Sequence, residues 1–302
     1  DNGMEDPYTM VYEDRWLLDN MISMTKDFYQ DLNGNGVRDE EGGDVYGIYG
    51  ASHSVCNMAY YYLKIVEKTE DNYIKVNFGS ERNEEILTKL KDWFTASEGF
   101  LYQSDGWTDV PQFAEYENCV FVMQSLQRCV NLRDYDVDYG IVPIPKYDEA
   151  QERHITVVGN PVSFYAVYTL SEDVNRAAAV LECWASEAYR TTTPAVFETT
   201  FKLRLSESST ESRMYDIIRN GVTFDLCRFF NRQLSSMGSE WYKCATTAGN
   251  WASTSEKLMR SLPKQLQDIA DSFNKIDNCI CCRKVGSKTT LITNTYIYSF
   301  TF

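Results

Sequence analysis

Between residues 113 and 167 the chain carries three short apolar runs, each followed by residues typical of turns, and these runs constrain the fold more than any other feature. The first run contains the block VFVM at residues 120–123 and ends in Gln124 and Ser125, which predicts a buried strand that opens into a loop. The second run, residues 139–142, leads into Pro143-Ile144-Pro145. Proline fixes φ and lacks an N–H group, so a central strand cannot continue through this segment.

The third run is divided by Gly159-Asn160-Pro161, which leaves exposed backbone and the Ser163 hydroxyl between two strand-like pieces. Around the three runs, hydrophobic periodicity predicts helices at residues 16–29, 55–66, 81–97, 174–186, 212–219, 240–245 and 254–273. It predicts short strands at residues 45–48, 73–77, 119–123, 139–142 and 157–168. Alternation of helices and strands indicates the α/β class.

A second motif, DLNGNGVRD, occupies residues 31–39. With a glycine at position six, it supplies oxygen ligands at the positions that a Ca²⁺ loop requires: Asp31, Asn33, Asn35, the Val37 carbonyl and Asp39. Position twelve, where a bidentate carboxylate is expected, is Gly42, and Glu41 or Asp44 is the alternative ligand. We therefore predict a structural Ca²⁺ site, and the alternative is an Asn-Gly turn with solvated acids.

Composition restricts the class of partner. With 302 residues, of which 43% are hydrophobic, the chain can form about two domains. A net charge of −15 argues against nucleic acid, because no basic surface is available to displace counterions. Twenty-one Tyr and six Trp residues supply flat amphipathic faces for a neutral polar ligand, although most of the tyrosines are expected in the core or at its rim. The sequence contains no catalytic signature such as Gly-x-Ser-x-Gly, a phosphate loop or His-Glu-x-x-His.

The nine cysteines fall into two groups. Six occur singly within apolar surroundings and are predicted to be small buried hydrophobic residues: Cys56, Cys119, Cys129, Cys183, Cys227 and Cys244. The other three, Cys279, Cys281 and Cys282, are clustered, but their spacing matches no zinc signature.

The order of these elements resembles the extracellular solute-binding proteins of ABC importers, of the carbohydrate-type family 1. The resemblance rests on Phe-x6-Val-x2-Met ending at Met123, on Pro-x-Pro-Lys ending at Lys146, and on the following Gly-containing strand. It continues with Ala-Ala-x-x-Leu-Glu, ending at Glu182, in a predicted helix with an acidic start. It covers residues 8–275 and is strongest over residues 16–225.

The resemblance implies an α/β, two-lobe, periplasmic-binding-protein-like (type II) architecture with discontinuous lobes. Lobe two would comprise residues 1–145 plus 205–276, and residues 146–204 would be a remnant of lobe one. Hinges are expected near residues 143–146 and 201–205, and residues 277–302 form an atypical tail. We expect the first part of lobe one, the signal and the lipid anchor to be missing from this N-terminally incomplete sequence.

The resemblance further implies a non-enzymatic, monomeric protein that captures a sugar or oligosaccharide between its lobes and delivers it to ABC permease subunits. It would be extracellular, anchored at the cell surface, and would contact the membrane only through the absent lipid anchor. The expected ligand contacts are Tyr49, Ser52, His53, Trp107, Ser125, Gln127, Asn160, Ser163, Phe224, Asp225 and Arg228. For each, packing or a turn role is the alternative. Two other functions remain open, a calcium-dependent extracellular adhesion or scaffold module and a glycoside hydrolase with paired carboxylates.

Overall fold

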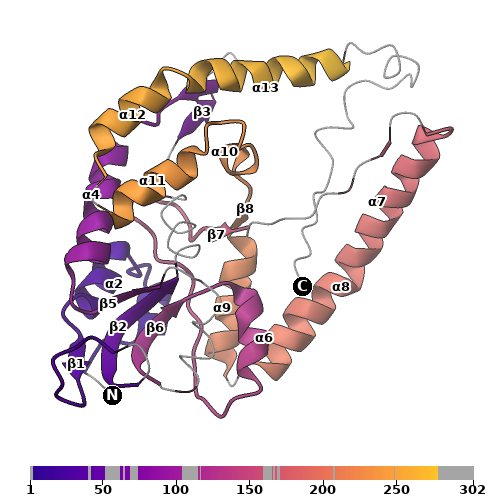
Figure 1. Ribbon diagram of the computed structural model, residues 1–302. Coiled ribbons are helices and arrows are strands. Elements are labelled where there is room, and N and C mark those ends of the chain that lie inside the picture. Colours follow the sequence, from indigo (N-terminus) through magenta and orange to yellow (C-terminus); the bar gives the residue numbers. More distant parts are fainter. Residues whose placement is uncertain are drawn as a thin grey trace.

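A four-stranded sheet organises the first part of the chain (Figure 1). Its central strand β2 (Asp44–Ala51) pairs antiparallel with β1 (Tyr29–Asp31) and parallel with both β5 (Phe100–Gln103) and β6 (Cys119–Met123). The computed structural model describes residues 3–39, 42–51, 62–63, 65–68, 74–103, 115, 117–158, 165, 167–168, 171–206, 208–247 and 249–277. Helices and strands are mixed, as the sequence predicts for the α/β class.

Two further pairs of strands lie outside this sheet. Strand β3 (Val66–Lys68) pairs antiparallel with β4 (Ile74–Val76), and β7 (Thr156–Val157) pairs parallel with β8 (Val222–Thr223). The helices are α1 (Pro7–Tyr12), α2 (Leu18–Thr25), α4 (Glu81–Ala96), η1 (Leu126–Arg128), α6 (Cys129–Leu132), α7 (Val174–Arg190), α8 (Thr192–Pro194), η2 (Ala195–Arg204), α9 (Ser209–Asn220), α10 (Leu226–Phe229), α11 (Met237–Thr246), α12 (Trp251–Met259) and α13 (Leu262–Asp277). Among the described residues, none of these helices has the combination of length and apolar character needed to span a bilayer.

Helix α4 follows directly from its sequence. The Ser80 side chain accepts a hydrogen bond from the Asn83 amide at 3.3 Å and caps the first turn. The buried side chains recur at helical spacing and form one apolar stripe: Ile86, Leu87, Leu90, Trp93 and Phe94. The predicted helix over residues 81–97 is therefore confirmed to within one residue.

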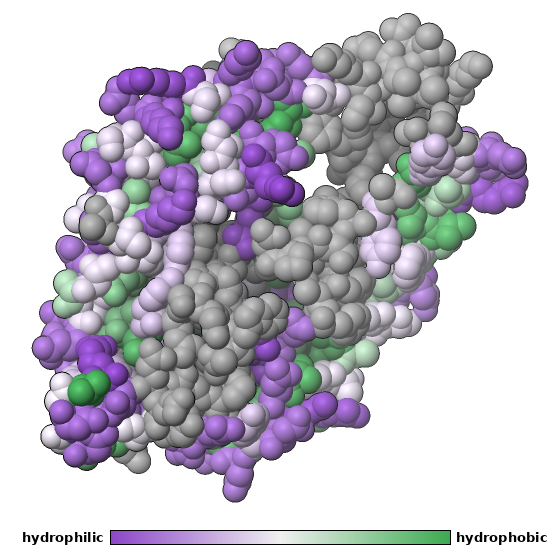
Figure 2. All heavy atoms as spheres, viewed as in Figure 1, coloured by the Kyte–Doolittle hydropathy of each residue, from purple (hydrophilic) through white to green (hydrophobic). Residues whose placement is uncertain are grey.

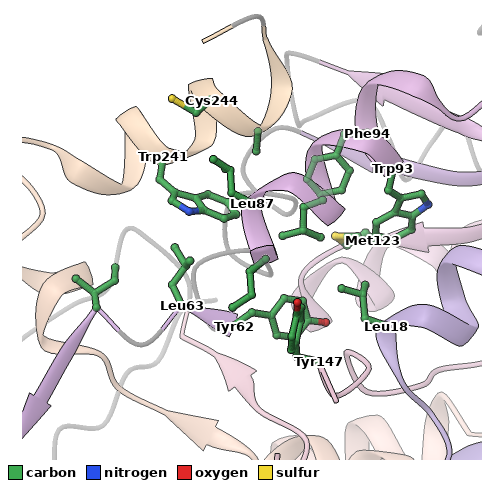
Figure 3. Close-up of a cluster of buried hydrophobic side chains, with 14 of the residues drawn as sticks. Leu18, Tyr62, Leu63, Leu87, Trp93, Phe94, Met123, Tyr147, Trp241 and Cys244 are labelled. Carbon is green, nitrogen blue, oxygen red and sulfur yellow. The ribbon is translucent and has the colours of Figure 1, made fainter. Parts of the chain in front are cut away.

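The stripe of α4 packs against α11 and the sheet in the principal core (Figure 3). Trp241 of α11 is fully buried, and Met123 at the end of β6 lies in the same cluster as Leu87 and Phe94. Burial of each such side chain contributes about 1.5–3 kcal/mol relative to exposure. Packing against α4 and α11 therefore fixes the position of the sheet.

The predicted strand at residues 139–142 is wrong, since residues 136–145 form no ladder. Four consecutive carbonyls of the next segment accept hydrogen bonds from separate donors: Pro143 from Trp16 Nε1 at 2.8 Å, Ile144 from His154 Nδ1 at 2.8 Å, Pro145 from Tyr62 Oη at 2.9 Å and Lys146 from the Leu18 amide at 2.7 Å. Pro143 and Pro145 have no N–H group, so the segment cannot form a continuous strand ladder. Its carbonyls are satisfied instead by three side chains and one backbone amide. We call Pro143 to Lys146 the Pro-Lys segment.

Other differences from the predicted elements have local causes. The single helix predicted over residues 254–273 is divided into α12 and α13, because Pro263 is tolerated only in the first turn of a helix. The helix predicted over residues 16–29 ends at Thr25, and β1 follows it. Of the strand predicted over residues 157–168, the described part contains only its start in β7, and the helix predicted at 55–66 lies mostly outside the described residues.

Helix α7 runs along one border of the molecule and leaves apolar side chains uncovered by other described residues (Figures 1 and 2). Val180 is 59% exposed and Trp184 is 56% exposed, with the Trp184 ring 5.0 Å from that of Tyr165. Cys183 is exposed on the same helix, so its prediction as a buried residue is wrong, whereas Cys227 and Cys244 are buried as predicted.

His154 gives the Pro-Lys segment a pH dependence. Its ring is buried, with Nδ1 donating to the Ile144 carbonyl and Nε2 without a hydrogen-bond partner among the described residues. Burial lowers the pKa of His154, and the Lys146 ammonium acts in the same direction. The unfolded state therefore binds the proton more readily, so this contribution to stability is complete above the unfolded pKa of about 6.5 and is lost as the pH falls through that value toward the folded pKa.

We accordingly expect the melting temperature of the wild-type protein to fall between about pH 7.5 and pH 5.5. The variant His154→Gln should show a shallower pH dependence, because glutamine does not titrate and its amide can still donate to the Ile144 carbonyl. Thermal denaturation followed by circular dichroism across this range measures both slopes. Equal slopes for the two proteins would contradict this role of His154.

Candidate ligand-binding site

The carboxyl ends of three parallel strands meet at one edge of the main sheet. In β2 and β6, Gly50 is opposite Met123, and in β2 and β5, Ala51 is opposite Gln103. These pairings bring the three chain ends together at what we call the carboxyl edge. In open α/β sheets, ligands bind outside the carboxyl ends of the strands, so this edge is the first place to look for a site.

Two of the expected ligand contacts lie at the carboxyl edge, directly after β6. Ser125 precedes η1, and its hydroxyl makes no capping hydrogen bond, while its amide donates to Gln124 Oε1 at 2.6 Å. Ser125 and Gln127 are both exposed. A hydroxyl and a carboxamide, each able to donate and accept, are therefore presented to solvent at the end of a half-buried strand.

Three other expected contacts follow the neighbouring strands in sequence. Ser52 and His53 come directly after β2, and Trp107 comes four residues after the end of β5. All three lie outside the described residues. For these three residues, the structure shows only the ends of β2 and β5, the strands that precede them in sequence.

Tyr49 was expected to contact ligand, but the structure places its side chain in the core. It is 2% exposed and packs in a small cluster with Tyr46 and Leu101. The reason is that Leu101 of β5 and Val122 of β6, which are opposite Tyr49 on the two neighbouring strands, pack against it on the same face of the sheet. The packing role is thus the one observed for Tyr49.

The residues predicted near position 225 form a second group, between β8 and α10. Asp225 Oδ1 accepts a hydrogen bond from the Arg228 amide at 2.8 Å, and burial raises the pKa of Asp225. The Arg228 Nε donates to the Val158 carbonyl at 3.2 Å. Phe224 is 41% exposed and stacks on Phe229 with ring centroids 5.7 Å apart.

The bond from Arg228 to Val158 joins this group to the segment after β7. Asn160 and Ser163, which were expected to contact ligand, follow Val158 in sequence but lie outside the described residues. The structure therefore brings Phe224, Asp225 and Arg228 to the start of the segment that contains these two residues. Asp225 also has a structural role, because its carboxylate accepts the Arg228 amide and so caps the first turn of α10.

One candidate at the carboxyl edge was missed by the sequence analysis. Tyr102, near the end of β5, is opposite Gly50 of β2, and its partly buried ring lies 6.4 Å from that of Tyr242. The only signal was the short apolar run after Gly99, which is too brief to distinguish a strand from a loop. An aromatic ring at this position would offer a stacking surface at the carboxyl edge.

The predicted calcium loop joins β1 to β2, so it lies between antiparallel strands and not after a helix as expected. Asp31 accepts hydrogen bonds from the amides of Gly34 at 2.6 Å and Gly36 at 2.9 Å, and both glycines have the positive φ that the tight turn requires. No three His, Cys, Asp or Glu side chains are assembled for a metal anywhere in the described part of the chain. Glu41 lies outside that part.

Comparison with known proteins adds a similarity of fold. No family model and no curated protein sequence matches this chain. Among solved structures, the chain is similar to the maltose/maltodextrin-binding domain MalE from Bdellovibrio bacteriovorus bound to maltotriose, with a TM-score of 0.53 and 13% sequence identity. The match covers 83% of this chain and 67% of that chain. The protein described here therefore shares the fold of a domain that binds a maltodextrin.

Proposed function

We propose that the protein is the solute-binding subunit of an ABC importer, which captures a neutral sugar or oligosaccharide and delivers it to the permease. The observation that carries this proposal is the fold shared with a maltotriose-bound domain, combined with polar side chains at the carboxyl edge. A protein with a net charge of −15 suits an uncharged ligand better than an anionic one. The proposal requires binding alone and no covalent step.

The two groups of side chains have complementary chemistry for a saccharide. At the carboxyl edge, Ser125 and Gln127 can exchange hydrogen bonds with sugar hydroxyls, and the Tyr102 ring can stack on a C–H face. Near β8, the partly exposed Phe224 ring provides a second stacking surface. Arg228 has donors beyond the Nε that binds Val158. We assign Ser52, His53, Trp107, Asn160 and Ser163 to the same ligand.

Ligand capture would proceed by closure of two lobes, residues 1–145 plus 205–276 and residues 146–204. A saccharide that contacts both lobes stabilises the closed form, because only closure lets Asn160 and Ser163 of residues 146–204 contact it together with the residues of the other lobe. The Pro-Lys segment is one proposed hinge, and residues 201–205 are the other. We further propose a monomer that acts outside the cell and is tethered to the surface.

A thermal-shift panel tests this function. Maltotriose, maltose and other neutral saccharides are added to the protein, with charged sugars as controls. A saccharide that binds only the folded state stabilises it by about 2.7 kcal/mol at 100 times its Kd, which corresponds to a rise in Tm of roughly 5 °C or more. No rise with any neutral saccharide would overturn the proposal. Release of reducing sugar during incubation would instead identify a hydrolase.

A further inference from the structure

Asp44, the first residue of β2, carries a buried carboxylate oxygen without a partner. The residue is 0% exposed. Its Oδ2 accepts hydrogen bonds from the Asp39 amide at 2.7 Å, the Tyr29 hydroxyl at 3.0 Å and the Tyr46 hydroxyl at 3.2 Å. Its Oδ1 has no hydrogen-bond partner among the described residues. A buried carboxylate oxygen left unsatisfied is costly, so this atom points to a missing ligand.

The carboxylate lies directly beside the loop of residues 31–39. Asp39, which donates its amide to Asp44, is the ninth residue of that loop. Gly43 packs so closely that a Cβ there would lie 2.5 Å from Asp39 Oδ2 and 2.6 Å from Asn33 Nδ2. The absence of a side chain at Gly43 therefore allows the start of β2 to lie against the polar side chains of the loop.

Two loop side chains contact the same oxygen of Asp39. The Nδ2 atoms of Asn33 and Asn35 both donate to Asp39 Oδ2 at 2.7 Å. The Oδ1 atoms of these two asparagines accept backbone amides from Asn35 at 2.9 Å and Val37 at 2.7 Å, which fixes the orientation of both side chains. Each amide oxygen keeps a second lone pair for another partner.

The charges of this region also call for a cation. Asp31, Asp39 and Asp44 contribute three carboxylates. The nearest described cation, Arg38, stacks on the Tyr29 and Tyr46 rings at 4.9 and 5.0 Å and donates to the Phe100 carbonyl at 3.2 Å. Within the described residues, Arg38 forms no ion pair with any of these carboxylates, so their charge is not neutralised by direct contact.

We propose that Asp44 replaces the missing carboxylate of position twelve and completes a Ca²⁺ site with the loop. The oxygen ligands would be Asp31, Asn33, Asn35, the Val37 carbonyl, Asp39 and Asp44, which gives the six or more oxygens that Ca²⁺ prefers. In the structure, Asp31, Asp39 and Asp44 are not assembled as three carboxylates around one point, so ion binding would draw these side chains together. The ion would fix the loop to the start of β2, the strand that ends at the carboxyl edge.

Terbium luminescence tests this site directly in the full chain, without any saccharide. Tyr29 and Tyr46, hydrogen-bonded to Asp44, should sensitise bound Tb³⁺, and Ca²⁺ should displace it. We expect saturable emission and a Ca²⁺ dissociation constant of about 10⁻⁴–10⁻³ M, with weaker Mg²⁺ binding. No saturable emission, or equal affinity for Mg²⁺, would overturn the proposal.

Variants locate the ion. Asp44→Asn keeps the side-chain size but removes the charge, and Asp31→Asn does the same at a half-buried residue at the end of β1, outside the core clusters. Both should weaken Ca²⁺ binding about tenfold or more, while the matched control Asp138→Asn should bind as the wild type does. If Asp44→Asn fails to fold, Asp31→Asn still decides whether the loop binds the ion. Wild-type affinity in Asp31→Asn would overturn the loop site, and wild-type affinity in a folded Asp44→Asn would overturn the role of Asp44.

Discussion

Replacing Trp16 with alanine is expected to lower the free energy of unfolding by about 3–5 kcal/mol. The Trp16 ring is 0% exposed and lies 6.0 Å from the Phe121 ring of β6. Its Nε1 donates to the Pro143 carbonyl at 2.8 Å, and this acceptor would be left buried without its donor. The loss thus combines a cavity with an unsatisfied polar group.

Urea denaturation measures this effect, and two variants separate its causes. Trp16→Phe keeps most of the ring and removes the N–H donor, so we expect an intermediate loss. Trp184→Ala makes the same truncation at a side chain that is 56% exposed, and its effect should stay below about 1 kcal/mol. A loss of less than 1 kcal/mol in Trp16→Ala would show that the Pro-Lys segment is not held by this contact.

Alanine at Gly99 should destabilise the protein by about 3 kcal/mol. A Cβ at this position would lie 1.7 Å from the Thr25 carbonyl oxygen, at the end of α2. Gly47 of β2 is restricted in the same way, with a Cβ 2.3 Å from the same oxygen. The end of α2 therefore packs directly against two glycines. The backbone of α2 or of the sheet would have to move if alanine replaced either glycine.

The matched control is Gly79→Ala. Its Cβ would meet its nearest neighbour, the Met259 side chain, at 3.7 Å, which is ordinary van der Waals contact. We expect a change within about 0.5 kcal/mol for this variant in the same denaturation experiment. Similar effects at Gly79 and Gly99 would contradict the close approach of α2 to the sheet.

Helices and strands with a clear hydrophobic pattern along their own residues could be predicted from the sequence. Strands that exist only because they pair with residues far away in the sequence could not. The apolar stripe and Ser80 cap identify α4, and the block of residues 120–123 identifies β6. In contrast, β7 and β8 each have only two residues and are defined by their pairing with each other across a long stretch of chain. The Pro-Lys segment is likewise held by donors from distant residues.

The same distinction applies to the candidate sites. Ser125 and Gln127 could be predicted in a loop because they follow a short apolar run, and the structure places them, exposed, at the carboxyl edge; the strand before them is half-buried and not buried as predicted. The burial of Tyr49 could not be predicted, because it depends on the side chains of Leu101 and Val122, which distant strands place beside it. Sequence spacing left Glu41 and Asp44 as alternatives, and the proposed ion site uses Asp44, whose buried carboxylate the structure describes, whereas Glu41 lies outside the described residues.

Calorimetric titration of the neutral saccharide panel, beginning with maltotriose, tests saccharide binding at the carboxyl edge most directly. We expect saturable binding to the wild-type protein and about tenfold weaker binding to Gln127→Ala, equivalent to the loss of about 1.4 kcal/mol. Gln267→Ala on α13 is the matched control and should bind as the wild type does. The absence of saturable binding for every saccharide by folded protein, or unchanged affinity in Gln127→Ala, would contradict a saccharide site at the carboxyl edge.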